Sequence, residues 1–211
     1  MYQLTSELYF PPVSFASPEG ILAYGGDLSK ERLLLAYQSG IFPWFEEDQP
    51  ILWWSPDPRM VLFPDELIVS KSMRNILNRN SFKITFNQNF REVISNCRQI
   101  KRNGQIGTWI TREMVDAYCD LNVSGIAKSV EVWQNEQLVG GLYGIDLGHV
   151  FCGESMFSKV SNASKVAFIA LAGYLKENNY KLLDCQVYNE HLESLGGREI
   201  PRTDFLTTLK Q

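Results

Sequence analysis

The chain has 211 residues, 45% of them hydrophobic and 21% charged, with a formal net charge of −4 at pH 7. This length suits one large domain, or one domain with a small companion, and the apolar fraction is enough for a core. No stretch approaches the roughly 18 consecutive apolar residues of a membrane span, and the first six residues lack the features of a signal peptide. We therefore expect a soluble, monomeric, cytoplasmic protein with no membrane partner.

The residues that could hold a metal are few and scattered. The four cysteines form no CxxC pair and the chain has only two histidines, at Cys97, Cys119, Cys152, Cys185, His149 and His191. This spacing favours reduced thiols and offers no metal-ligand cluster. We predict neither a metal site nor any other cofactor.

Charge is distributed unevenly along the chain. Between Lys71 and Arg112 there are nine basic residues against the single acid Glu92, which gives a local charge of +8. The remaining residues hold 11 basic and 23 acidic side chains. Such a basic block can attract a polyanion to one face of an acidic protein, although a solvated basic face without a partner is common.

Residues 1–60 are rich in proline, glycine and aromatic side chains and contain one clear helix. Cap candidates at Asp27 and Ser29 precede an apolar stripe at residues 31–37, which Gly40 ends. Residues 40–59 then hold three of the five tryptophans and four prolines, so we expect neither a helix nor a central strand there. This run is either a rigid aromatic binding surface or a small sealed core.

Beyond residue 60 the sequence alternates between the two-residue period of strands and the 3.6-residue period of helices. Strand patterns occupy residues 60–63, 82–86, 129–133, 138–145, 149–154 and 180–188. Helical patterns occupy residues 70–79, 89–102, 111–122 and 165–177. An antiparallel meander followed by a long helix and another strand predicts the α+β class.

The strand at 180–188 carries two polar side chains in an apolar setting. Alternation places Asp184 and Gln186 on one face and Leu183, Cys185 and Val187 on the other. A carboxylate and an amide are costly to bury without partners, so the pair is a candidate site. The competing interpretation is a pair that fastens a neighbouring loop.

Glu154 is a second candidate, because it ends the meander just before the long helix. We expect Glu154 to lie near Asp184 and Gln186, where two carboxylates could bind a cation or share a proton. The helix start at 161–165 offers free N–H groups for an anion, or ordinary capping. No P-loop, GxGxxG, GxSxG or Ser-His-Asp order is present, and His191 alone favours a structural role.

Taken together, these residues resemble the leucyl/phenylalanyl-tRNA–protein transferase family over nearly the whole chain. The matching blocks are Phe10-Pro11-Pro12, Gly25-Gly26-Asp27-Leu28-Ser29, Ala36-Tyr37 through Gly40-Ile41-Phe42-Pro43-Trp44-Phe45, Trp53-Trp54-Ser55-Pro56-Asp57-Pro58-Arg59, Gly107-Thr108-Trp109-Ile110-Thr111, Ser129-Val130-Glu131-Val132-Trp133, residues 151–158, Asn162-Ala163-Ser164-Lys165, Asp184-Cys185-Gln186, Ser194-Leu195-Gly196 and Ile200-Pro201-Arg202. Many blocks in register are far more specific than any one alone.

The resemblance implies an aminoacyltransferase that moves Leu or Phe, with Met as a further candidate, from aminoacyl-tRNA to an N-terminal Arg or Lys of a protein. The peptide bond so formed feeds N-end rule degradation. The implied fold is a small N-terminal domain, at residues 1–60, packed on a GNAT-like, acetyltransferase-like mixed α/β catalytic domain at residues 61–211.

The resemblance also implies roles for individual residues. Trp44 and Trp109 would contact the 3′-terminal adenosine. Apart from the resemblance, the position of Trp53 and Trp54 beside Ser55-Pro56-Asp57-Pro58 favours a seal between the small domain and the large one. The pocket for the adenosine and the aminoacyl group would also be lined by Leu142, Phe151, Met156 and Ser158. The basic block would contact the tRNA backbone through Lys71, Arg74, Arg79, Lys83, Arg91, Arg98, Lys101 and Arg102.

Asp184 and Gln186 match the family's catalytic pair, and Glu154 would bind the basic side chain of the acceptor peptide. We expect Asp184 to attract the substrate cation and to orient Gln186, whose side-chain oxygen accepts a hydrogen from the attacking amine. Glutamine is a poor base, so proton transfer to water or to the tRNA ribose hydroxyl stays open. Lys128 and Gly197 depart from the family's usual His and Ala and leave substrate preference open.

Two other classes of protein compete with this interpretation. An acyl-CoA N-acetyltransferase would normally open the long helix with a glycine-rich turn, which residues 162–165 lack. A non-enzymatic RNA-binding module would have no evident use for Glu154 and Asp184, because acids repel a polyanion. Titration with acetyl-CoA and with deacylated tRNA would separate the three.

Overall fold

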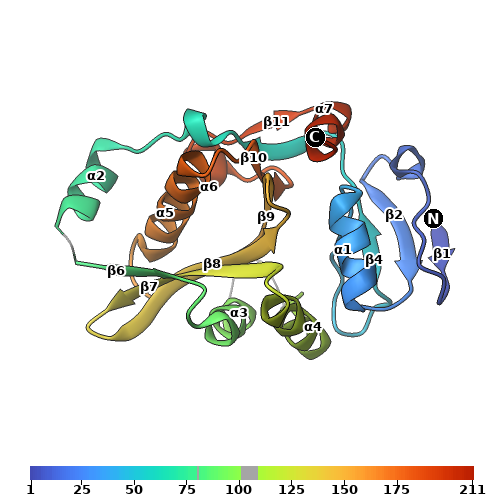
Figure 1. Cartoon of the computed structure of the whole chain (residues 1–211), viewed down its shortest axis with the longest axis horizontal. Coiled ribbons are helices and arrows are strands. Elements are labelled where there is room, and N and C mark those ends of the chain that lie inside the picture. The colour runs from blue at the N-terminus through green and yellow to red at the C-terminus, as the bar shows by residue number, and fades with distance from the viewer. Residues whose placement is uncertain (80, 101–108) are drawn as a thin grey trace.

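The computed structural model describes residues 1–79, 81–100 and 109–211, so that Lys101 and Arg102 of the predicted tRNA contacts lie outside the described residues. The chain builds a four-stranded sheet from its N-terminal residues and a seven-stranded sheet from the rest (Figure 1). Helix α1 lies on the side of the small sheet that faces the large one, and it contacts α4.

The secondary structure alternates along the chain. The strands are β1 (Tyr2–Leu4), β2 (Ile21–Gly25), β3 (Phe42–Pro43), β4 (Leu52–Trp54), β5 (Arg59–Leu62), β6 (Lys83–Phe86), β7 (Ala127–Gln134), β8 (Gln137–Asp146), β9 (Val150–Ser158), β10 (Leu182–Gln186) and β11 (Arg198–Ile200). The helices are α1 (Lys30–Gln38), α2 (Lys71–Asn78), α3 (Phe90–Gln99), α4 (Arg112–Val123), α5 (Ala163–Glu177), α6 (Glu190–Glu193) and α7 (Arg202–Leu209), with 3₁₀ turns at Val13–Phe15 and Pro64–Glu66.

The small sheet corrects one expectation from the sequence. Its order is β1-β2-β4-β3, so β4 is an interior strand although it lies within the proline-rich run. The prediction of no central strand there is wrong because Pro50 and Pro56 lie outside the paired residues, while Pro43 sits on edge strand β3. Helix α1 begins as predicted, since the Ser29 side chain accepts the Arg32 N–H.

The large sheet has the order β11-β5-β10-β9-β8-β7-β6. All neighbours are antiparallel except β9 and β10, which are parallel and pair only from Leu182 to Asp184, opposite Val150 to Cys152. Beyond Asp184 the two strands no longer pair, and β9 continues to Ser158 against β8 alone. The sheet therefore opens between β9 and β10 in its middle.

The two faces of the large sheet carry different hydrophobic clusters. Helix α5 covers one face with α2, whereas α3 and α4 cover the other (Figure 1). The cluster on the α3 face continues into the small sheet and includes Leu33 and Tyr37 of α1. One core therefore joins the small sheet to the large one.

The helices and strands predicted beyond residue 60 all form, with ends that differ by a few residues. Those missed along the whole chain are short or irregular, namely β1, β2, β3, β4, β11, α6 and α7. The α+β class, with a small N-terminal part beside a larger mixed sheet, is confirmed. A domain boundary at residue 60 stays a prediction. Within the described part of the chain, every helix is too short or too polar to cross a bilayer.

Candidate active site

A cavity of about 420 Å³ opens where β9 and β10 part. Its two ends differ in chemistry. The end toward the α3 face is aromatic and is lined by Phe42, Trp44, Trp109 and Tyr143. The end toward the α5 face is mostly aliphatic and is lined by Leu142, Met156, Phe168, Leu171, Leu183 and Leu192. The cavity thus passes through the sheet. Two of its polar groups, Glu154 and Gln186, come from the parted strands, and Ser155, Asn189 and His191 also line it.

Glu154 lies at an irregularity in β9. Tyr143 pairs with Ser155 and Gly144 with Gly153, so Glu154 is the extra residue of a β-bulge. One carboxyl oxygen accepts a hydrogen bond from the Tyr118 hydroxyl at 3.1 Å. The other accepts one from Gln186 Nε2 at 3.3 Å. The predicted proximity of Glu154 to the end of β10 is therefore confirmed.

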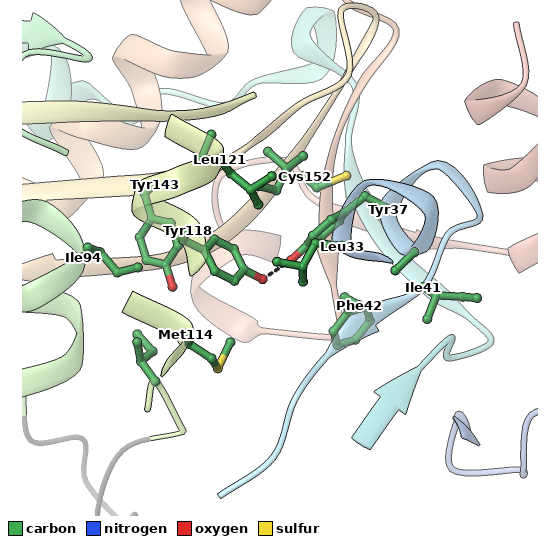
Figure 2. Close-up of a cluster of buried hydrophobic side chains, with 14 of the residues drawn as sticks. Leu33, Tyr37, Ile41, Phe42, Ile94, Met114, Tyr118, Leu121, Tyr143 and Cys152 are labelled. Atoms are coloured by element: carbon green, nitrogen blue, oxygen red, sulfur yellow. Dashed lines mark hydrogen bonds between the residues drawn. The ribbon is translucent and has the colours of Figure 1, made fainter. Parts of the chain in front are cut away.

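Tyr118 connects Glu154 to the small sheet. Its hydroxyl is also hydrogen-bonded to the hydroxyl of Tyr37, and Figure 2 shows the two rings pointing toward each other from α4 and α1. Both rings are fully buried. This chain of hydroxyl groups fixes the orientation of the Glu154 carboxyl group, and it places α1 in direct contact with the site.

Burial raises the pKa of Glu154 from 4.5 to about 7, because the surrounding apolar groups disfavour its charged form. Hydrogen bonds from Tyr37 and Tyr118 oppose this rise, and the negative charge of Asp184 adds to it. A carboxyl group with a pKa near neutrality can accept or release a proton at the pH of the cell. Such shifts are typical of functional sites.

Alternation along the strand predicts that Asp184 and Gln186 share a face, but in the structure they do not. Asp184 pairs with Val61 and Gln186 with Met60, so Cys185 is an extra residue and β10 carries a second bulge. The bulge turns the Gln186 side chain into the cavity beside Leu183 and Cys185.

Asp184 points away from the cavity and is 1% exposed. Arg59 donates to both of its carboxyl oxygens, each at 2.8 Å. The prediction that Asp184 attracts the substrate cation is therefore wrong, because this carboxylate is buried and already paired. Its predicted link to Gln186 exists through the backbone, since Asp184 Oδ1 accepts the Gln186 N–H at 3.0 Å.

Comparison with known proteins assigns the chain to a family. The model described as leucyl/phenylalanyl-tRNA protein transferase matches residues 61–210, and the model of the N-terminal domain of the same family matches residues 26–57. The chain belongs to the leucyl/phenylalanyl-tRNA–protein transferase family. The resemblance found in the sequence and the prediction of a transferase enzyme are thereby confirmed.

Individual relatives match the chain along its whole length. The leucyl/phenylalanyl-tRNA–protein transferase of Flavobacterium johnsoniae is 74% identical over 100% of this chain and 99% of its own length. That of Syntrophobacter fumaroxidans is 53% identical over 100% of this chain and 90% of its own length.

Solved structures match less closely. L-PGS from Bacillus licheniformis has a TM-score of 0.43 at 14% identity and covers 80% of this chain and 53% of that one. A ribosomal-protein-alanine N-acetyltransferase from Brucella melitensis has a TM-score of 0.38 at 13% identity and covers 55% of this chain and 86% of that one.

Some of the residues that the resemblance assigned to the pocket line the cavity, and others do not. Trp44, Trp109, Leu142 and Met156 line the cavity. Phe151 does not line it and is buried in the cluster on the α5 face. Ser158 does not either, since its hydroxyl group donates to Val160 O and accepts the Ser164 N–H at the start of α5.

The two other tryptophans contact the small sheet. Trp53 packs edge-on against Phe10 and donates to Gly25 O at 2.9 Å. Trp54 donates to Trp44 O at 2.7 Å, and the two rings lie 5.3 Å apart. These contacts hold Trp44 at the cavity, and both tryptophans belong to or pack against the cluster that joins the small sheet to the large one, while their role as a domain seal stays a prediction.

The basic residues divide between the two faces of the large sheet. Lys71, Arg74 and Arg79 lie on or beside α2, which packs into the cluster on the α5 face. Arg91 and Arg98 lie on α3 on the opposite face, and Arg98 Nε donates to Ile110 O, next to Trp109. Lys83 lies on edge strand β6. The predicted single basic face is thus split between the two faces of the sheet. The basic residues of α3 lie on the same face as the aromatic end of the cavity.

The sequence patterns do not predict a role in the site for three residues, Tyr37, Tyr118 and Arg59. Tyr37 lies in the predicted apolar stripe at residues 31–37 and in a block that matches the family, and Tyr118 lies in the predicted helix at residues 111–122, but neither pattern assigns a role to the hydroxyl group. Arg59 was visible as the last residue of a matching block, without a role. The hydroxyl groups on otherwise apolar helix faces were the available signal, because buried hydroxyl groups require partners.

The raised pKa of Glu154 has a consequence for stability. The folded protein binds this proton more tightly than the unfolded chain, so the contribution to stability is present below about pH 4.5 and is lost as the pH rises through about 7. The free energy of unfolding of Glu154→Gln minus that of wild type should therefore increase over this interval, by at most about 3 kcal/mol.

Urea denaturation at several pH values measures this difference. Glu177→Gln, at the exposed end of α5, controls for the loss of one negative charge. A difference that does not vary between pH 4.5 and pH 8 would contradict the raised pKa.

Proposed function

We propose that this protein transfers Leu or Phe, with Met as a further candidate, from aminoacyl-tRNA to the α-amine of an N-terminal Arg or Lys of a protein. The observation that carries the proposal is a cavity with two unlike ends, joined at Glu154 and Gln186. The donor has the same three parts in the same order, namely a flat base, a reactive ester and an apolar side chain.

The aromatic end suits the terminal adenosine of the tRNA. Trp44 and Trp109 offer ring surfaces for stacking, which contributes about 1–3 kcal/mol per base. The aliphatic end suits the Leu or Phe side chain, because Leu142, Met156 and Leu171 offer no charge or hydrogen bond to a polar one. The ester would then lie between the two ends, beside Glu154 and Gln186.

The chemistry requires alignment and one proton acceptor. The amine nitrogen forms a bond to the ester carbonyl carbon, the bond from that carbon to the tRNA ribose oxygen breaks, and the proton lost by the nitrogen finally protonates that oxygen. Gln186 Nε2 donates to Glu154, which leaves the Gln186 side-chain oxygen to accept a hydrogen from the amine. Glu154 takes the proton, since its pKa of about 7 is near that of an α-amine, roughly 7.7–8.0.

Glu154 also favours the proposed acceptor. Its ionised form attracts the positive charge of an N-terminal Arg or Lys, as the sequence resemblance implied. The product would carry a new N-terminal Leu or Phe and enter N-end rule degradation. We place the reaction in the cytoplasm, where aminoacyl-tRNA is used for protein synthesis.

Transfer of labelled Leu or Phe from its tRNA to a peptide beginning with Arg tests the function. We expect a labelled peptide with Arg or Lys at its N-terminus and none with Asp there. The same Arg peptide with an acetylated N-terminus should stay unlabelled, because its nitrogen is no longer a nucleophile. Absence of transfer to the Arg and Lys peptides would refute the proposal.

Binding of the tRNA backbone should depend on the α3 face. Arg91→Ala should weaken binding and reduce the slope of log K against log salt by up to about 1, because each phosphate contact releases counterions. Arg79→Ala, beyond the end of α2 on the opposite face, should leave the slope unchanged. Filter binding of deacylated tRNA at several salt concentrations measures both, and equal slopes for the two variants would contradict this path.

A further inference from the structure

Arg59 has an unusual environment for an arginine. It begins β5 and is 1% exposed, and its Nε and Nη2 atoms hold the two oxygens of Asp184. Its Nη1 atom donates to Gly40 O at 3.2 Å. The guanidinium carbon lies 4.9 Å from the ring centre of Phe42 and 4.6 Å from that of Phe205. Three separate parts of the chain, besides β5 itself, therefore meet at this one side chain.

Such an arrangement is costly if stability is its only purpose. Two charges removed from water lose their hydration, and apolar residues of similar volume often serve the fold equally well or better. What an arginine adds is geometry, because its planar fork fixes a carboxylate in two directions at once. The position of Asp184 is therefore set with high precision.

Asp184 passes this constraint on to Gln186. The oxygen that accepts from Arg59 Nε also accepts the Gln186 N–H at 3.0 Å. Gln186 has a φ of 62°, in the left-handed region that a side chain with a Cβ rarely adopts. The surroundings must hold such a residue in place, and the Asp184 carboxylate is the group that does so here.

The contacts of Arg59 with Gly40 and Phe42 lead to the wall of the cavity that carries Trp44, whereas Gln186 belongs to another wall. Gly40 has a φ of 74° and ends α1, and Phe42 begins the segment that carries Trp44 into the aromatic end. Arg59 thus touches the backbone before Trp44 and, through Asp184, the backbone of Gln186. The distance between these walls decides how the two substrates meet.

We propose that Arg59 is a positioning residue, which fixes the Gln186 amide through Asp184 and the segment before Trp44 through Gly40. The proposal rests on the transfer function proposed above. Asp184 then acts with Arg59 as a positioning residue, and Gln186 and Glu154 are left to contact the reacting amine.

Arg59→Lys tests the proposal, because it keeps the charge and removes the fork. We expect kcat for transfer to fall about tenfold to a hundredfold, with little change in KM for aminoacyl-tRNA, since misplacement by about 1 Å can cost this much. Hydrogen exchange at the Gln186 amide should accelerate relative to that of Leu183 in the same strand. A loss of stability alone would accelerate both amides together.

Arg32→Lys is the matched control. Arg32 is also 1% exposed and donates to Thr5 O and Glu7 O, but it lies near the start of α1 and does not line the cavity. It should lower stability without changing kcat per folded molecule. Equal losses of kcat in the two variants, or an unchanged kcat in Arg59→Lys, would overturn the positioning role.

Asp184→Asn covers the case in which Arg59→Lys does not fold. It keeps the volume and an oxygen that can accept the Gln186 N–H, so kcat should fall less than in Asp184→Ala, where the acceptor is lost. Equal kcat in both Asp184 variants would refute the proposal. If wild type shows no transfer, the exchange of Gln186 still decides the positioning, and only the proposed function fails.

Discussion

Replacing Glu154 by glutamine is expected to lower kcat for transfer by about 10²–10⁴-fold, the usual contribution of a general base. The variant keeps the shape of the side chain and one oxygen for the Tyr118 hydroxyl, but it cannot take a proton. Binding of the tRNA end should persist, because Trp44 and Trp109 are unchanged. Single-turnover transfer from Phe-tRNA to a peptide beginning with Arg measures the loss.

The pH profile separates this role from simple attraction of the substrate. In wild type, kcat should rise as the pH passes about 7, where Glu154 loses its proton. The acceptor amine titrates as well, so both proteins should show its rise near pH 7.7–8.0. The variant should lack only the earlier rise. A profile of identical shape in both proteins would mean that Glu154 does not accept the proton.

Much of this site could be expected from the sequence, because local patterns report burial and chain order well. Glu154 and Gln186 stood out as polar groups in apolar strands, and the order of meander, helix and strand placed them near each other. Trp44 stood out through its stiff, proline-rich surroundings. These signals are local, and the structure joins all three at one cavity.

Local sequence patterns could not predict which face of β9 or β10 each side chain occupies. Strict alternation assumes one residue per pleat, and the extra residues Glu154 and Cys185 break it in both strands that border the opening. A bulge depends on pairing with a distant strand, so a single strand does not reveal it. Asp184 was therefore placed in the cavity, and its partner Arg59, 125 positions away, could not be foreseen.

Loss of Glu131 should reduce stability strongly. It is fully buried on β7 and its carboxyl group accepts four hydrogen bonds. The donors are Thr85 Oγ1 at 2.6 Å, Ser129 Oγ at 2.5 Å, and the N–H groups of Gln88 and Asn89 at 3.3 Å each. Asn89 precedes the first residue of α3 and its own side chain does not cap the helix. Glu131 therefore ties the start of α3 to the sheet.

Glu131→Ala should lower the free energy of unfolding by about 3–5 kcal/mol, because each buried donor left without an acceptor costs about 1–3 kcal/mol. Ser129→Ala removes one donor and leaves the acceptor with three partners, so it should cost about 1 kcal/mol. Urea denaturation followed by circular dichroism measures both. A cost for Glu131→Ala no larger than that for Ser129→Ala would show that the four bonds are not coupled.

The same network gives a physical reason for the sequence Ser129-Val130-Glu131-Val132-Trp133. Ser129, Glu131 and Trp133 alternate along β7, and all three join one hydrogen-bonded chain, since Trp133 Nε1 donates to Thr85 Oγ1 at 2.8 Å. The two valines point to the other face and enter the cluster beneath α5. Both faces of this strand are buried, one in polar and one in apolar contacts. Because Glu131 does not line the cavity, kcat per folded molecule should stay unchanged in Glu131→Ala while stability falls.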